Sequence, residues 1–123
     1  MENKIKLLIV DDEENIRELM KLHFNRRGFS VLTANSGLQA VTCAKENSPH
    51  IMLLDKRMPE MDGIEALGNI RGFNQDIKVI IISGDELDSD TSFKIKELNV
   101  AAYLLKPVDI ADLDNILSKI TSM

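Results

Sequence analysis

Reactive polar residues directly follow four apolar segments of the sequence. Asp11 and Asp12 follow one such segment, Asp55 follows a second, Ser83 a third and Lys106 a fourth. Together they supply three carboxylates, a hydroxyl and an ammonium group. If the fold gathers them, these groups can bind a cation, attack an electrophilic centre and neutralise negative charge that develops there.

The three aspartates would repel one another in a shared site. At a separation of about 4 Å and an effective dielectric constant near 20, each pair of carboxylates costs roughly 4 kcal/mol. A bound cation would offset this repulsion. Hard oxygen ligands without paired His or Cys residues suit Mg²⁺, which accepts one or two carboxylates and leaves sites for water and phosphate oxygens. We therefore expect Mg²⁺ to be the counter-ion of Asp11, Asp12 and Asp55.

Asp55 is the candidate nucleophile. An aspartate carboxylate can attack a phosphoryl group and form an acyl phosphate. Asp55 stands alone after its segment, whereas the adjacent Asp11 and Asp12 are better arranged to hold the cation directly and through water. The Lys106 ammonium and the Ser83 hydroxyl would then meet the charge on the phosphoryl oxygens.

Each of these residues also has an ordinary structural interpretation. The acidic run after Val10 is favoured at the start of a helix by the helix dipole, and Asp55 alone is compatible with a turn. Ser83 precedes a glycine, as turn residues often do, and Lys106 suits a solvated strand end. Their joint placement after four of the five predicted strands is what favours a shared site.

Five segments predict the strands that would position these residues. Three are apolar without strict alternation, which is typical of strands buried on both faces of a parallel sheet. The other two are weaker and contain β-branched or aromatic residues. The predicted strands are Ile5–Val10, Ser30–Asn35, Ile51–Leu54, Val79–Ile82 and Ala101–Leu105.

Segments with helical periodicity lie between these strands. The segment from Leu87 to Asn99 predicts a weakly packed helix, because its apolar anchors are few. Expected helix ends are the N-caps Ser36 and Asp109, the stop at Gly28, and the pair Gly63 and Gly72 around a short third helix. The expected apolar anchors are Ile16, Leu19, Met20, His23 and Phe24 in the first helix, Phe93, Ile95 and Leu98 in the weak helix, and Ile110, Leu113, Ile116, Leu117 and Ile120 in the last.

The alternation of strands and helices predicts a doubly wound α/β fold of the type (βα)5. Right-handed crossovers place helices on both faces of one parallel sheet. For five strands the leading order is 2-1-3-4-5, as in flavodoxin-like folds, with a switch point between the first and third strands. Ligands of such folds bind beyond the carboxyl ends of the strands, where all the reactive residues above would lie.

Length and composition limit the range of functions. The 123 residues, of which 44% are hydrophobic, suit one domain over 1–123 without an effector domain. A net charge of -5 and the lack of a basic stripe argue against direct nucleic-acid binding. The opening MENKIKLLIVDDEE is too short and too charged for a signal peptide or membrane span, so we expect a cytoplasmic protein without membrane contact.

The chain resembles the receiver domain of two-component response regulators. The resemblance covers practically the whole chain through LLIVDDEENIR, MLLDKRMPEMDGIE, VIIISG and YLLKPVD, in the family's order and spacing. It implies that Asp55 accepts phosphate from a histidine kinase or a histidine phosphotransfer protein. It also implies that Asp11, Asp12 and the backbone carbonyl of Arg57 arrange Mg²⁺ beside the acceptor.

The resemblance implies further roles near the end of the chain. Ser83 and Lys106 match the family's hydroxyl and lysine, and Lys106-Pro107 matches a peptide bond that is usually cis there. Tyr103 matches an aromatic residue that turns inward as the hydroxyl moves toward the phosphoryl group. From the sequence alone, Tyr103 is equally compatible with a half-buried strand aromatic.

Three residues at the expected rim of the site raise separate questions. Lys56 follows the acceptor where the family more often has an apolar residue. If Lys56 points inward it lowers the acceptor's pKa or attracts phosphate, and if it points outward, which we favour, it is a rim charge. Arg57 and Asp85 match positions that influence how long the phosphoryl group lasts. We hypothesise that they pair across the mouth and hinder an attacking water.

The last strand and helix also differ from many family members. Ala101 and Ala102 replace an acidic pair, and the final helix carries a single lysine, so a salt-bridged dimer would lack most of its charges. We expect a monomer or weak dimer. The expected output, to a downstream effector domain or protein, is a change in the face formed by the fourth helix, fifth strand and fifth helix.

Two rival functions remain open at this point. A Mg²⁺-dependent phosphohydrolase would also form an aspartyl phosphate, but it would need an acid two residues after the nucleophile, where this chain has Arg57. An unphosphorylated interaction domain could keep the fold alone, but the full set of acceptor residues disfavours it. We therefore expect a phospho-acceptor and not an enzyme with turnover.

Overall fold

A parallel sheet of five strands forms the centre of the computed structural model, which describes residues 4–122. The expected domain limits at residues 1 and 123 therefore lie outside the described residues. In chain order the elements are β1 (Lys6–Val10), α1 (Glu14–Arg26), β2 (Ser30–Ala34), α2 (Gly37–Asn47), β3 (Ile51–Asp55), α3 (Gly63–Arg71), β4 (Lys78–Ser83), α4 (Ser89–Glu97), β5 (Ala102–Leu105) and α5 (Ile110–Thr121).

The strand order β2-β1-β3-β4-β5 confirms the prediction. Because β1 and β3 are neighbours, with Val10 opposite Leu54, their carboxyl ends meet at the switch point of the sheet. β3 and β4 extend one residue further than expected, so Asp55 and Ser83 are the last residues of their strands. Both side chains are thus fixed by strand backbone.

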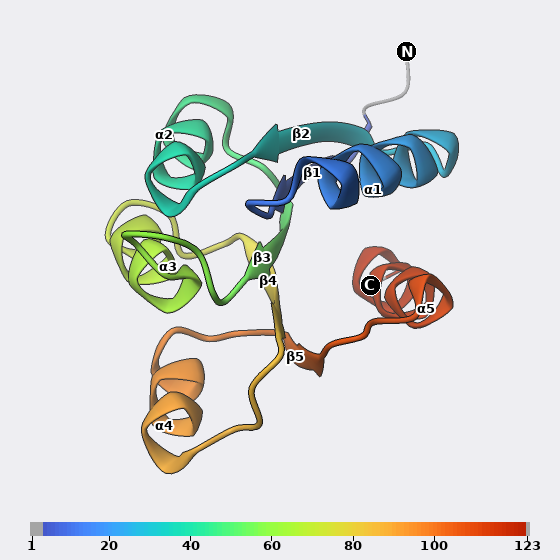
Figure 1. Ribbon diagram of the computed structural model, residues 1–123. Helices are drawn as coiled ribbons and strands as arrows, with labels where there is room; N and C mark the ends of the chain where they lie inside the picture. The colour runs from blue at the N-terminus through green and yellow to red at the C-terminus, as the bar shows by residue number, and fades with distance from the viewer. Residues whose placement is uncertain (1–3, 123) are drawn as a thin grey trace.

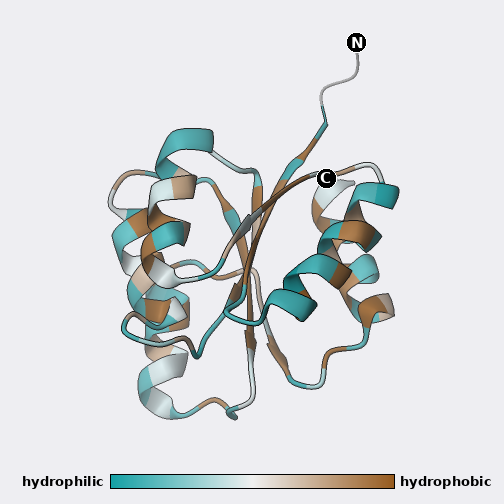
Figure 2. Ribbon diagram, turned by 45° about the horizontal axis from the view of Figure 1, so that its top comes forward, coloured by the Kyte–Doolittle hydropathy of each residue, from teal (hydrophilic) through white to brown (hydrophobic). Residues whose placement is uncertain are grey.

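Helices cover both faces of the sheet, as Figure 1 shows: α1 and α5 lie on one side, and α2, α3 and α4 on the other. Each face has its own apolar cluster. Figure 2 shows the hydrophobic residues concentrated on the strands and on the inner sides of the helices. In β3 all five residues are buried, which confirms the prediction of strands covered on both faces.

Side-chain caps define where most helices begin. Ser36 accepts a hydrogen bond from the N–H of Gln39, and Asp109 accepts one from the N–H of Ala111, which confirms both expected N-caps. Gly28, with φ of 96°, follows α1 in the left-handed region that glycine adopts without strain. The short third helix lies between Gly63 and Gly72 as expected.

Two of the expected apolar anchors point away from the core. Leu19 of α1 is 64% exposed and Phe93 of α4 is 67% exposed, so both predictions are wrong. Five residues separate Leu19 from the buried Phe24, which places Leu19 about 140° around the helix axis from it. Phe93 lies about 160° around the helix axis from both Thr91, which is buried, and Ile95, which packs against the core. Both side chains therefore point to solvent.

A third expected anchor, Ile110, is also exposed, for a different reason. It lies about 20° around the helix axis from the buried Leu117, so it belongs to the inner face of α5. However, Ile110 is the first residue of that helix, nearly two turns before Leu117. Ile110 therefore lies beyond the apolar cluster that contains Leu113 and Leu117. The prediction that Ile110 packs in the core is wrong.

Candidate functional site

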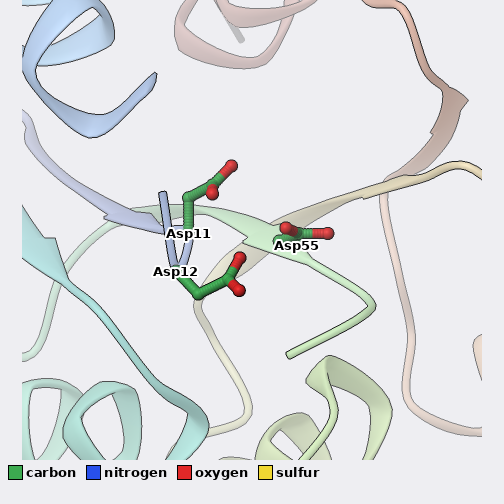
Figure 3. A group of neighbouring side chains, drawn as sticks. All are labelled: Asp11, Asp12 and Asp55. Carbon is green, nitrogen blue, oxygen red and sulfur yellow. The ribbon is translucent and has the colours of Figure 1, made fainter. Parts of the chain in front are cut away.

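Three carboxylates meet at the carboxyl edge of the sheet, as predicted. Figure 3 shows Asp11 and Asp12, just after β1, beside Asp55 at the end of β3. Each of the three offers a carboxylate oxygen, and these oxygens all lie within 4.8 Å of one another. Asp55 is only 4% exposed and Asp11 only 7%, whereas Asp12 is exposed.

The turn after β1 is held by hydrogen bonds on three sides. The Asp11 N–H donates to the carbonyl of Ala34 at 3.2 Å, and a carboxylate oxygen of Asp11 accepts from the Glu13 N–H at 2.8 Å. The Arg17 guanidinium donates to the Asp11 carbonyl at 2.8 Å. Sequence reasoning missed Arg17, although its place in the first turn of a helix after an acidic run was a usable signal.

Asp55 contacts a cation but remains an unfavourable place for a negative charge. Its carboxylate accepts hydrogen bonds from the Lys106 ammonium at 3.2 Å and from the Arg57 N–H at 3.3 Å. Burial nevertheless raises the pKa of Asp55, since desolvation outweighs the opposing effect of Lys106, and Asp12 adds repulsion. The structure therefore brings Lys106 to the acceptor candidate without fully compensating its charge.

The electrostatics and the donor set fit a hard divalent cation. Burial raises the pKa of Asp11, and the hydrogen bond from Glu13 only partly offsets the desolvation and the neighbouring Asp55 and Asp12. Carboxylate oxygens are the ligands that Mg²⁺ prefers, and the exposure of Asp12 leaves a side open to water and phosphate oxygens. The three aspartates thus match the requirements of a Mg²⁺ site.

The loop between β3 and α3 packs tightly against the acceptor. The Gly63 N–H donates to the Lys56 carbonyl at 2.7 Å, and the Lys56 N–H donates to the Ile82 carbonyl at 2.9 Å. A Cβ at position 63 would collide with the carbonyl oxygen of Asp55. Glycine at this position therefore lets α3 begin directly beside the end of β3.

Ser83 and Tyr103 are connected through one residue, Asp85. Ser83 is completely buried, and its Oγ accepts a hydrogen bond from the Asp85 N–H at 2.9 Å. The hydroxyl of the half-buried Tyr103 donates to the Asp85 carbonyl at 2.7 Å. The loop after β4 is thereby tied both to the end of β4 and to β5.

The side chain of Asp85 also meets the two cations that follow the acceptor. Asp85 Oδ2 lies 2.6 Å from Arg57 Nε and 3.9 Å from Lys56 Nζ. The hydrogen bond from Arg57 holds the pKa of Asp85 below its usual range and raises the pKa of Arg57 in turn. The pairing of Arg57 with Asp85 is thus present, while its effect on an attacking water stays a prediction.

Lys56 points to Asp85 and not to the acceptor carboxylate. Its side chain is only 16% exposed, so it is less solvated than the rim charge that we expected. A cavity of about 440 Å³ next to it is lined by residues of both loops: Lys56, Arg57, Met58, Pro59, Asp62 and Asp85. The Lys106-Pro107 peptide bond is cis, and the Arg57 carbonyl remains an expected metal ligand.

The sequence matches the family model of the response regulator receiver domain over residues 7–118. It is 37% identical over 115 residues to sporulation initiation phosphotransferase F of Bacillus subtilis (strain 168), covering 93% of this chain and 91% of that protein. It is 33% identical over 114 residues to the regulatory protein AtoC of Escherichia coli (strain K12), covering 93% of this chain but only 24% of AtoC.

Solved structures support the same relationship. A response regulator receiver protein from Pseudomonas putida is 27% identical with a TM-score of 0.87, over 97% of this chain and 99% of that chain. The CheX-CheY complex with BeF3 and Mg²⁺ from Borrelia burgdorferi contains a chain that is 29% identical with a TM-score of 0.85, over 95% of this chain and 89% of that one. This chain therefore belongs to the family of receiver domains of two-component response regulators.

Proposed function

We propose that Asp55 is the phospho-acceptor of this receiver domain and takes its phosphoryl group from a histidine kinase or a histidine phosphotransfer protein. The observation that carries the proposal is the buried Asp55 carboxylate, which contacts Lys106 and lies beside Asp11 and Asp12 at the switch point of the sheet. An acceptor, a cation-binding pair and a neutralising ammonium are thereby combined in one site.

The acidic residues would hold Mg²⁺ through carboxylate oxygens of Asp11, Asp12 and Asp55 and through the Arg57 carbonyl. When bound, the ion supplies positive charge that lowers the repulsion between the acceptor and an incoming phosphate. Lys106 stabilises charge on the phosphoryl oxygens from its own contact with Asp55. The Asp85 N–H occupies a lone pair of the Ser83 oxygen and does not use the O–H of Ser83. In the proposed function, this O–H donates to a phosphoryl oxygen.

The consequence of phosphorylation would be read on the face formed by α4, β5 and α5, by a downstream effector domain or protein. Ser83 and Tyr103 both contact Asp85, so a shift of Ser83 toward the phosphoryl group would be passed to β5 and to the loop before α4.

We further propose a cytoplasmic protein that is a monomer or weak dimer. Among residues 4–122, every helix is too short or too polar to cross a lipid bilayer.

The test is incubation of the protein with Mg²⁺ and acetyl phosphate or phosphoramidate, followed by intact mass spectrometry. We expect the mass of one phosphoryl group to be added, and Asp55→Asn to add none. The matched control is Asp76→Asn, which changes an exposed aspartate just before β4, at the opposite edge of the sheet from the site. No adduct on the wild-type protein would contradict the proposal, and sustained turnover of a phosphomonoester would favour the phosphohydrolase instead.

A further inference from the structure

Lys56 is held more rigidly than its position in a loop suggests. Its N–H donates to the Ile82 carbonyl and its carbonyl accepts from the Gly63 N–H, so both of its backbone groups are bound. A Cβ at position 63 would lie 3.1 Å from the Lys56 Cα, so Gly63 lies against this part of the backbone. The ammonium of Lys56 is therefore projected from a fixed point directly after the acceptor.

The two cations that meet Asp85 differ in how far water screens them. The Arg57 side chain is 77% exposed, so its contact with Asp85 is close but solvated. The Lys56 side chain is 16% exposed, and its Nζ lies 3.9 Å from Asp85 Oδ2, which is an ion-pair distance and not a hydrogen bond. Exposed ion pairs contribute little, whereas screening falls as burial increases. Arg57 therefore makes the direct hydrogen bond to Asp85, and Lys56 adds a second, more buried cation beside the same carboxylate.

Asp85 connects this charge to the residues expected to sense the phosphoryl group. Its carboxylate faces Lys56 and Arg57, its N–H donates to Ser83, and its carbonyl accepts from Tyr103. Asp85 therefore links the two cations, through its side chain, to the Ser83 and Tyr103 hydroxyls, through its backbone. Ser83 is fully buried, and the Asp85 N–H is the hydrogen-bond donor that contacts its Oγ.

We propose that Lys56 is a positioning residue for phosphoryl transfer: it holds the Asp85 carboxylate and thereby fixes the hydroxyl of Ser83 at the carboxyl end of β4. This inference rests on the proposed function for its kinetic consequence, but the positioning itself is a property of the unphosphorylated protein. The competing explanation is that Lys56 attracts anionic phosphodonors directly, without Asp85 or Ser83.

The first measurement is made without any phosphodonor, by following the backbone amide of Asp85 with NMR. Lys56→Met is expected to shift the Asp85 amide resonance and to speed its hydrogen exchange about three-fold or more, because its partner Ser83 is held less firmly. Lys56→Arg keeps the charge and should restore the wild-type signal. The control Lys21→Met removes an exposed lysine of α1 and should leave the amide unchanged. An unchanged Asp85 amide in Lys56→Met overturns the proposal.

The second measurement is the rate of phosphorylation by phosphoramidate with Mg²⁺. Lys56→Met is expected to slow it roughly three- to ten-fold in the wild-type background and to have no further effect in Ser83→Ala, as for residues that act through a shared contact. An equal loss in both backgrounds overturns positioning and favours direct attraction of the donor. Lys56→Gln is the second variant, and urea unfolding confirms that each variant is folded.

The two measurements separate this proposal from the proposed function. If the wild-type protein accepts no phosphoryl group, the phospho-acceptor function fails while the NMR result still decides whether Lys56 positions Ser83. If the wild-type protein is phosphorylated and the Asp85 amide is unchanged in Lys56→Met, the function stands and the positioning role is wrong.

Discussion

Strand β3 is buried along its whole length, whereas helix α4 is mostly exposed on the same domain. All five residues of β3 are buried, while Thr91 is the buried residue that α4 contributes. The acceptor candidate Asp55 ends the buried strand, and the expected output face contains the exposed helix. The candidate acceptor thus lies where packing on both faces opposes movement of the backbone, and the expected output face lies where packing opposes it least.

The two ends of α4 are held by different contacts. Arg71, at the end of α3, donates hydrogen bonds to the carbonyls of Leu98 at 2.9 Å and Asn99 at 3.3 Å, directly after α4. The N-terminal end of α4 is instead capped from within its own segment, since Asp88 accepts a hydrogen bond from the Thr91 N–H at 2.7 Å. A rearrangement of α4 would therefore pivot about its C-terminal end, which another helix holds.

The comparison is tested most strongly by truncating one large side chain in each region. Leu54→Ala in β3 should lower the free energy of unfolding by about 3 kcal/mol, because it opens a cavity in a core that is closed on both faces. Phe93→Ala in α4 should change it by less than about 0.5 kcal/mol, since that ring is in solvent. Urea unfolding monitored by circular dichroism measures both values. Equal losses would mean that α4 packs more firmly than its exposure indicates.

The chemical side of the comparison depends on Lys106. Removing its ammonium in Lys106→Ala should slow phosphorylation by phosphoramidate about 100-fold, as when one stabilising donor is taken from a developing negative charge. Lys94→Ala, on the exposed helix α4, is the matched control and should react at the wild-type rate. The prediction is wrong if both variants lose activity to the same extent.

The acidic cluster should lower the stability of the metal-free protein at neutral pH. Because the pKa of Asp11 is raised in the folded state, the metal-free protein is most stable below pH 3.8 with respect to this group, and that stability is lost as the pH rises through the raised pKa. Asp11→Asn should therefore stabilise the metal-free protein at pH 7 by about 1 kcal/mol, or roughly 3 to 6 °C in Tm.

Thermal unfolding with and without Mg²⁺ provides the check on this prediction. Mg²⁺ should raise the Tm of the wild-type protein more than that of Asp11→Asn, since the variant lacks one ligand. The advantage of the variant should disappear below pH 3.8, where the wild-type carboxylate is protonated as well. A variant that is less stable than wild type at pH 7 would contradict the electrostatic explanation.

Hydrogen exchange can sharpen the comparison within α4. With BeF3 and Mg²⁺ as a phosphoryl mimic, amides from Thr91 to Phe93 should change their exchange rate about three-fold, while those from Leu98 to Val100, next to the Arg71 contacts, should change less. Mass spectrometry of peptides from the two ends of α4 measures the contrast. Equal exchange in both states would count against a movable α4.

The smallest effect is expected at the solvated rim. Arg57→Ala removes a contact with Asp85 whose cation is 77% exposed, so the lifetime of the aspartyl phosphate should shorten by only about two- to three-fold. Loss of the phosphoryl group over time, followed by intact mass, measures it, with Lys21→Met as the control. An unchanged lifetime would show that the pair does not hinder water.

Much of the fold and of the site could be predicted because both depend on local patterns. Apolar segments without alternation identify buried parallel strands, and the carboxyl ends of such strands meet at one edge of the sheet. With the expected strand order, these rules predict that Asp11 and Asp55 lie together, and the weaker strand signal before Lys106 adds the ammonium. Helix caps such as Ser36 and Asp109 have equally local signals.

The failures depend on direction and on distance along the chain. An apolar residue does not by itself show which side of a helix is buried, and Leu19 and Phe93 lie about 140° and 160° around their helices from the buried residues. The direction of Lys56 depends on Asp85, and the role of Arg71 depends on carbonyls 27 and 28 residues away. Local periodicity cannot predict these contacts, because they join residues that are far apart in the sequence.

The close approach at Gly63 has a consequence for the genetics of this protein. A methyl group there would push against the carbonyl of the acceptor candidate itself, so a saturation library selected for signalling should return glycine at codon 63 almost exclusively. Gly68, five residues further along α3, has open space where a methyl group would lie and should accept alanine freely, with a small gain in helix stability. Mutational tolerance would thus change from nearly none to broad within two turns of one helix.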